Sequence, residues 1–239
     1  MTEQEWLEGS DPEEMLVGLD ELGASDRKAR LFLCACCRRI WDLFKDERCR
    51  EAVEIAERYA DGLASDDEIK EAQEVADVVA EETDETGLPH FEKVAHEGST
   101  NAAAFAVSDS VGRPMTWEAN SVAEWTVYAL AGSSSVDDRD QEAKRLADFD
   151  DEVRGQCGLL RDIFGNPFHP TTVNPAWLTP AVVQLAQTIY HDRAFHRLPI
   201  LADALEEAGC TDPEILRHCR GPGPHVRGCW VVDLLLGKE

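Results

Sequence analysis

The chain has 239 residues, of which 48 are Asp or Glu and 23 are Lys or Arg, so its formal net charge at pH 7 is −25. A surface this acidic repels phosphate groups, and we therefore expect no direct binding to nucleic acid or to an anionic membrane. The hydrophobic content of 43% is that of a folded protein with a core, which excludes a disordered acidic chain.

The acidic residues are unevenly distributed, and this asymmetry indicates how the chain is organised. Residues 1–98 carry 28 acidic and 11 basic side chains, whereas residues 156–239 carry 9 and 7. A run of Gly and Ser at 132–135 has the composition of a linker. We therefore predict three parts: an acidic N-terminal helical part at 1–132, a linker and polar helix at 133–156, and a near-neutral C-terminal helical module at 157–239.

The expected compartment follows from what the sequence lacks. No segment approaches the roughly 18 consecutive apolar residues of a membrane span. Residues 1–6 are acidic, with none of the apolar character of a secretory signal. The eight cysteines are then expected to be reduced thiols, because disulfides form mainly in oxidising compartments. We therefore predict a cytoplasmic protein that neither spans nor binds a membrane.

Helix-start signals dominate the N-terminal part. Side chains that cap helices stand at Thr2, Asp11 and Ser25, and a capping box occurs at Ser65-Asp66-Asp67-Glu68. After each of them, apolar residues recur every three or four positions, which is typical of a helix with one buried face. The N-terminal part is therefore predicted to consist of packed helices.

Three cysteines lie together in the helix that Ser25 begins. Cys34 and Cys37 share its apolar face, whereas Cys36 is expected to point elsewhere. That geometry does not favour a common metal ion. We therefore predict Cys34 and Cys37 to be core residues.

The same spacing predicts helices along the rest of the chain. Thr179 and Asp212 are predicted caps, each followed by Pro at the first helical position. Residues 230–236 form a last apolar segment, too short for periodicity to separate a helix from a strand. The predicted fold class is all-α, a multi-helix bundle-like assembly that allows one short terminal strand. The further helices are expected at 47–61, 66–80, 99–111, 115–130, 136–164, 180–190, 199–208 and 213–218.

The stretch HCRGPGPHVRGCW at 218–230 stands out, because alternating Gly and Pro force a defined loop. We predict Arg220, His225, Arg227 and Trp230 as its binding residues. One interpretation is a cradle for an anion such as phosphate, made by the arginines and by backbone N–H groups of the glycines. The other is that the arginines pair with the acidic N-terminal surface and dock the two halves, which we favour because carboxylates are so abundant there.

Five potential metal ligands surround this loop: Cys210, His218, Cys219, His225 and Cys229. They are sufficient for one tetrahedral Zn²⁺, which is the only cofactor that the sequence suggests. However, there is no Cys-x-x-Cys pair, and a predicted helix separates Cys210 from Cys219. Burial as free thiols is therefore the favoured interpretation of these cysteines.

A nucleophilic cysteine is a further alternative, with Cys229 activated by His225 or by His169. Arg227 and the start of the last helix would help to lower the pKa of that thiol. However, a Cys and a His within five residues of each other occur by chance in many chains. We name no catalytic residue, because no complete catalytic motif is present.

Distinctive blocks occur in both halves of the chain: SDRKARLFLCACCRRIW (25–41), AVEIAERYADG (52–62), LLRDIFGNPF (159–168), RLPILADALEEAGC (197–210) and CRGPGPHVRGCWVVDLLLGK (219–238). Together they resemble an uncharacterised group of bacterial hypothetical proteins that share these blocks. The resemblance covers most of 1–62 and 157–239. It implies a bacterial, cytosolic origin and brings no activity, cofactor or partner with it.

We therefore predict a cytosolic helical protein that binds or regulates through contacts with an unidentified protein partner, without catalysis. The charge favours a basic partner. One alternative is a zinc-dependent or thiol enzyme that uses the loop at 210–229. The other is an acidic protein that mimics nucleic acid and sequesters a nucleic-acid-binding protein through the acidic helix at 65–85.

Overall fold

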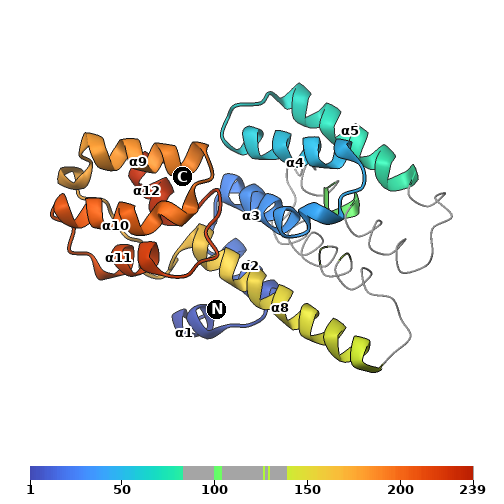
Figure 1. Cartoon of the computed structure of the whole chain (residues 1–239), viewed down its shortest axis with the longest axis horizontal. Coiled ribbons are helices and arrows are strands. Elements are labelled where there is room, and N and C mark those ends of the chain that lie inside the picture. Colours follow the sequence, from blue (N-terminus) through green and yellow to red (C-terminus); the bar gives the residue numbers. More distant parts are fainter. Residues whose placement is uncertain (83–99, 104–125, 127–128, 130–138, 239) are drawn as a thin grey trace. The chain divides into compact units, whose positions relative to one another are not determined.

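Figure 1 shows the computed structural model, which describes residues 1–82, 100–103, 126, 129 and 139–238. Every regular element in these ranges is a helix and none is a strand, so the predicted all-α fold is confirmed. None of the described helices is long and apolar enough to cross a bilayer. The chain divides into two compact units, Met1–Cys157 and Gly158–Glu239, and each is described here by itself.

The N-terminal unit begins at the predicted caps. The Thr2 side chain accepts a hydrogen bond from the Glu5 backbone N–H, and the Ser25 hydroxyl accepts one from that of Lys28. These bonds satisfy backbone donors that have no partner within the helix. The helices are α1 (Glu3–Glu8), α2 (Pro12–Glu21), α3 (Asp26–Arg39), the 3₁₀ turn η1 (Trp41–Leu43), α4 (Glu47–Ala60), α5 (Asp66–Glu82) and the first part of α8 (Arg139–Phe164).

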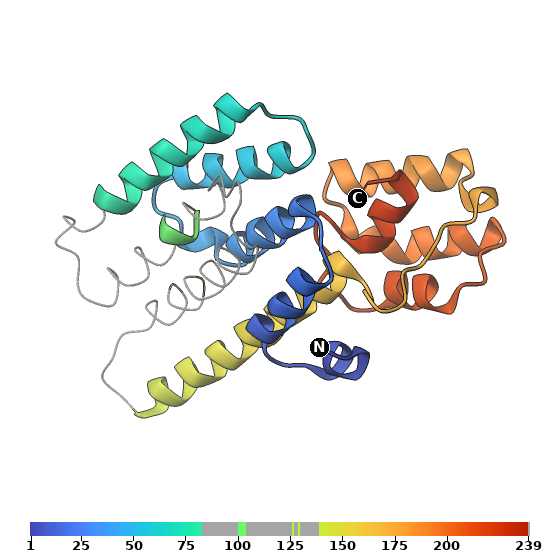
Figure 2. The ribbon, with the colours of Figure 1, turned by 180° about the vertical axis from the view of Figure 1, so that it is seen from behind.

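In this unit α4 packs between α3 and α5, as Figures 1 and 2 both show. Cys34 and Cys37 of α3 are buried, which confirms the prediction for both. Cys36, which is expected to point away from the face that these two share, is fully buried too. Eight of the side chains from Ala29 to Cys37 are buried, so α3 is covered around most of its circumference and not on one face only.

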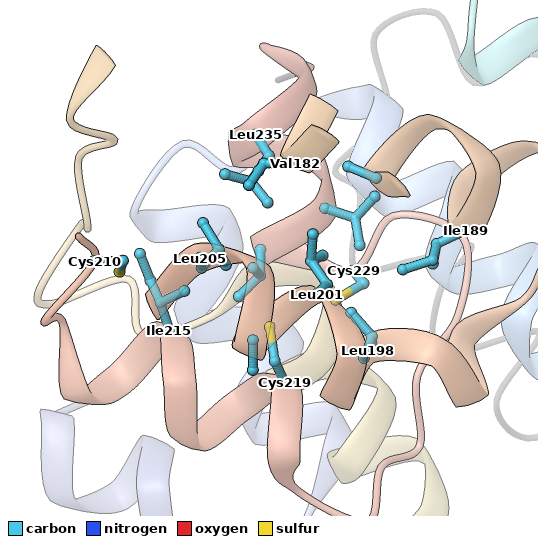
Figure 3. Close-up of a cluster of buried hydrophobic side chains, with 14 of the residues drawn as sticks. Val182, Ile189, Leu198, Leu201, Leu205, Cys210, Ile215, Cys219, Cys229 and Leu235 are labelled. Carbon is cyan, nitrogen blue, oxygen red and sulfur yellow. The ribbon is translucent and has the colours of Figure 1, made fainter. Parts of the chain in front are cut away.

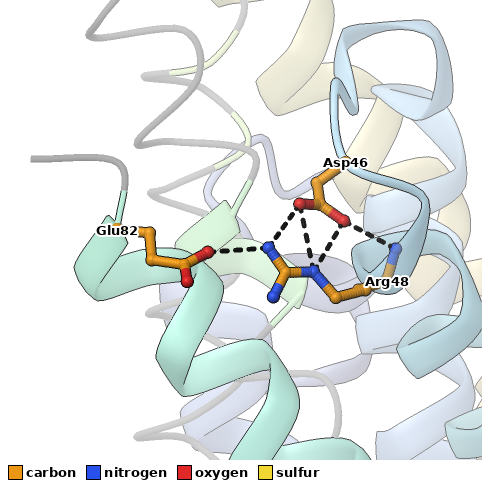
Figure 4. Close-up of polar contacts among 3 residues, drawn as sticks. All are labelled: Asp46, Arg48 and Glu82. Atoms are coloured by element: carbon orange, nitrogen blue, oxygen red, sulfur yellow. Dashed lines mark hydrogen bonds and ion pairs between the residues drawn. The ribbon is translucent and has the colours of Figure 1, made fainter. Parts of the chain in front are cut away.

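An ion-pair cluster holds the start of α4 to the end of α5 (Figure 4). The Asp46 carboxylate accepts a hydrogen bond of 2.9 Å from the Arg48 backbone N–H, which caps α4. The Arg48 guanidinium binds Asp46 and also reaches Glu82 at 2.7 Å. Because the Arg48 and Glu82 side chains are 41% and 58% exposed, their ion pair contributes little to stability.

The helices of the C-terminal unit pack around a single apolar core, in which α10 lies against α9 and α11, and α12 lies against α9 (Figures 1 and 3). Thr179 and Asp212 cap α9 and α11 as predicted. Residues 230–236, which the sequence left open, form a helix. The elements after α8 are η3 (Pro175–Trp177), α9 (Pro180–His191), η4 (Phe195–Arg197), α10 (Leu198–Glu207), α11 (Pro213–Arg220) and α12 (Trp230–Leu236).

Some predicted elements lie wholly or mostly outside the described residues. They are most of the helices expected at 99–111 and 115–130, the Gly-Ser run at 132–135, and residues 136–138 before α8.

Candidate metal centre

Four side chains of the C-terminal unit converge at one point. Asp162 comes from the last turns of α8, His218 from α11, His225 from the Gly-Pro loop, and Cys229 from the N-cap position of α12. Each offers one atom of a type that binds metals, and these four atoms all lie within 4.8 Å of one another. The residues could therefore hold a metal ion.

The loop reaches this point through two glycines with a left-handed backbone. Gly223 and Gly228 have φ angles of +85° and +96°, which other residues rarely adopt. Pro224 lies against Gly158 of α8, where an added Cβ would be only 3.0 Å from the proline ring. The side chain of His225, the next residue, is thus brought beside Asp162 on the same helix.

The Asp162 carboxylate is the hub of the cluster, with only 2% of its side chain exposed. Its Oδ1 lies 2.7 Å from His225 Nδ1 and 3.1 Å from His218 Nε2. Its Oδ2 accepts a hydrogen bond of 2.9 Å from the Val226 backbone N–H. Burial raises the pKa of this carboxyl, but the hydrogen bonds to His218 and His225 outweigh that effect and lower it below 3.8.

The His225 ring has a hydrogen-bond acceptor at each nitrogen. Nδ1 faces Asp162, and Nε2 lies 3.3 Å from the Gly221 carbonyl oxygen. Burial lowers the pKa of His225, but the Asp162 carboxylate and this carbonyl together raise it above 6.5. Because each nitrogen faces an acceptor, the protonated ring can donate from both of them.

The His218 ring is held differently. Its Nε2 lies 3.1 Å from Cys229 Sγ as well as from Asp162 Oδ1, while its Nδ1 accepts a hydrogen bond of 3.0 Å from the Trp230 indole N–H. The rings of His218 and His225 meet edge to face, with their centroids 4.8 Å apart. His218 is thus fixed by contacts on both of its ring nitrogens.

Cys229 is fully buried, and burial together with the nearby Asp162 charge raises the pKa of its thiol well above 9. In a catalytic relay, the thiol and the carboxylate lie at opposite nitrogens of the histidine. Here both lie at the same nitrogen, His218 Nε2. The arrangement therefore resembles a ligand set more than an activated nucleophile. A bound metal would instead keep the sulfur as a thiolate.

Of the predicted metal ligands, the structure brings together His218, His225 and Cys229. Cys210 and Cys219 belong to the apolar core and are not members of the four-residue group (Figure 3). Sequence reasoning missed Asp162. The available signal was a carboxylate among Leu159, Leu160 and Ile163, all buried, because a charge at such a position needs a partner.

The predicted binding residues have separate environments. Arg220 pairs with Asp203 at 2.8 Å and also with Glu206, both on α10 of its own unit and not on the acidic N-terminal part. Arg227 lies over the Tyr190 ring, 5.0 Å from its centroid. His225 pairs inward with a carboxylate of the same chain, as expected if the loop serves as a connector.

We compared the chain with models of protein families, with curated proteins and with solved structures, and none of the three comparisons found a significant match.

Proposed function

We propose that the C-terminal unit is a zinc-binding module, with one Zn²⁺ held in the cluster of Asp162, His218, His225 and Cys229. The observation that carries this proposal is the convergence of four ligand-type atoms within 4.8 Å. They come from separate segments of the chain, and two of the four residues are almost completely buried. These groups now bond to one another, and a cation between them could replace those contacts as their common partner.

The donor chemistry favours zinc among the metals that proteins bind. A thiolate together with imidazole selects Zn²⁺ over Mg²⁺ and Ca²⁺, which take oxygen ligands. In a tetrahedral site with bonds of about 2.0–2.3 Å, neighbouring ligand atoms are about 3.3–3.8 Å apart. The hydrogen-bonded contacts here are 2.7–3.1 Å. To bind zinc, the atoms that are now hydrogen-bonded would therefore need to move apart by about 1 Å at most.

The metal would join parts of the chain that are distant in sequence. Asp162 and His225 are 63 positions apart, and Cys229 precedes the final helix. Binding only the folded form, the metal would stabilise the unit in proportion to its affinity. A module held in this way would present a rigid surface to a protein partner, which is the role that we propose from the sequence.

The test is a comparison of two cysteine variants. Cys229 and Cys219 are both fully buried, but only Cys229 belongs to the cluster. We expect the wild-type protein and Cys219→Ala to bind one equivalent of Zn²⁺ in competition with a chromophoric chelator. Cys229→Ala should bind at least about 100-fold more weakly, because a direct ligand is lost.

Elemental analysis of the purified, untagged protein gives an independent measurement. Zinc at one equivalent is the expected result. The proposal is wrong if the wild-type protein binds no zinc, or if the two alanine variants lose affinity equally.

A further inference from the structure

The contact between Trp230 and His218 determines which nitrogen of His218 carries a proton. The Trp230 indole N–H lies 3.0 Å from His218 Nδ1. An indole nitrogen can only donate a hydrogen bond, so Nδ1 must accept and has no proton. In a neutral imidazole the proton is then on Nε2, which is the nitrogen that faces Asp162 and Cys229 at 3.1 Å.

A protonated Nε2 has no lone pair for a metal. A histidine that binds a metal through one nitrogen usually donates the N–H of the other nitrogen to an acceptor. His225 meets this condition, because its Nδ1 faces the cluster and its Nε2 lies 3.3 Å from the Gly221 carbonyl oxygen. His218 shows the opposite arrangement. Its nitrogen that faces away from the cluster, Nδ1, meets a hydrogen-bond donor, the Trp230 N–H, and not an acceptor.

Packing on two sides holds the Trp230 indole in the position from which it donates to His218 Nδ1. Trp230 is the first residue of α12, and its ring lies 5.2 Å from the His218 ring between centroids. On another side it lies against Gly165, where an added Cβ would be 3.1 Å from the Trp230 ring. The backbone of Gly165 has φ +66°, so glycine suits both its conformation and the space beside the ring.

We infer that the metal has three protein ligands, Asp162, His225 and Cys229, and a fourth, exchangeable position beside His218 that takes water or a small anion. This inference rests on the proposed zinc site. The His218 Nε2–H would donate a hydrogen bond to whatever occupies that position, which makes His218 a positioning residue. Three protein ligands with one open position are the arrangement of zinc sites that carry out chemistry, whereas structural sites have four protein ligands.

The exposed fractions of the side chains agree with an exchangeable metal position on the side of the two histidines. The His218 and His225 side chains are 17% and 11% exposed, whereas that of Asp162 is 2% exposed. A small ligand would therefore approach past the imidazole edges and not past the carboxylate.

The experiment is a double-mutant cycle on zinc affinity. Trp230→Phe keeps an aromatic ring but removes the indole N–H, so that His218 can hold its proton on Nδ1 and offer Nε2 to the metal. We expect Trp230→Phe to bind Zn²⁺ about 10-fold or more tightly than the wild-type protein, since it gains a ligand. This gain should vanish when His218→Ala is added. His218→Ala alone should cost less than about 10-fold, against at least about 100-fold for His225→Ala.

Cobalt spectroscopy gives a second readout. With Co²⁺ in the site, azide should shift the visible bands of the wild-type protein, because it enters the exchangeable position. The same addition should leave Trp230→Phe unchanged, because His218 fills that position. If His218→Ala does not fold, as judged by circular dichroism, His218→Gln replaces it in the cycle, because its amide can still accept from Trp230 and donate into the cluster.

The outcomes separate the two proposals. If no variant and no wild-type sample binds Zn²⁺ or Co²⁺, the proposed zinc site itself is wrong. If the metal binds but His218→Ala costs as much as His225→Ala, only the three-ligand inference is overturned. The inference is also overturned if Trp230→Phe weakens binding whether or not His218 is present.

Discussion

Replacing Asp162 by Ala removes the carboxylate that organises the cluster in the metal-free protein. Its two oxygens accept from His225 Nδ1 at 2.7 Å, from His218 Nε2 at 3.1 Å and from the Val226 backbone N–H at 2.9 Å. The variant leaves the His225 imidazolium without its counter-charge and the Val226 N–H without an acceptor. Both consequences destabilise the folded state.

The size of the effect follows from burial. With only 2% of the Asp162 side chain exposed, water can neither screen the pair nor replace it. Removing one partner of a buried ion pair lowers the free energy of unfolding by about 3–5 kcal/mol. The hydrogen bonds from His225 and from the Val226 N–H to the carboxylate, at about 1.5–3 kcal/mol each, give an overlapping range of about 3–6 kcal/mol. We therefore expect Asp162→Ala to lower the free energy of unfolding of the C-terminal unit by about 3–5 kcal/mol, a large part of the stability of a typical domain.

The assay is urea unfolding with excess EDTA, together with hydrogen exchange of α11 and α12 to follow this unit alone. Asp203→Ala is the matched control, because Asp203 also pairs with a basic residue of the loop region but has a side chain that is 70% exposed. We expect that control to change the stability little, as for other surface ion pairs. Equal stabilities for the two variants would show that the Asp162 network does not hold the loop.

Three further predictions concern pH, the loop and the thiols. Folding raises the pKa of His225 above 6.5, so the stability that protonated His225 contributes is fully present below pH 6.5 and is lost as the pH rises through its pKa in the folded protein. Folding lowers the pKa of Asp162, so the stability that this carboxylate contributes is lost only as the pH falls below about 3.8. Zinc affinity should instead increase with pH, because the ligands must lose protons, and chelator competition at several pH values would show a flat or falling affinity if that is wrong. In thermal unfolding without metal, His225→Ala should cost about 1–3 kcal/mol, because it removes a hydrogen-bond partner of the buried Asp162 carboxylate; an unchanged stability would contradict the assigned geometry. Cys34 and Cys37 should react slowly with a thiol reagent in the native protein, because both are buried, and fast labelling without denaturant would argue against the packing of α3.

The helices were predictable because their signals are local. The Ser25 and Thr179 hydroxyls cap helices through bonds to backbone N–H groups three positions ahead, so the sequence alone contains both partners. Residues 230–236 were not predictable, because seven apolar residues suit a helix and a strand equally. Packing of α12 against α9 in the apolar core supplied the missing information.

The candidate site was predictable only in part. The sequence indicated His218, His225 and Cys229, which lie within 12 positions of one another and flank a loop that Gly and Pro define. It also indicated Cys210 and Cys219, which have the right chemistry but point into the core. Spacing along the chain does not reveal which side of α11 faces the cluster.

The sequence by itself determined that this chain is helical, acidic in its first part, and supplied near its C-terminus with side chains of the types that bind metals. All three depend on composition or on contacts within a few residues. Only the tertiary structure decided that Asp162 completes the cluster and that Trp230 directs the proton of His218. The physical reason is that Asp162 and His225, 63 positions apart, meet only through the packing of α8 against the loop, and that a tautomer depends on the partner that each nitrogen meets in space.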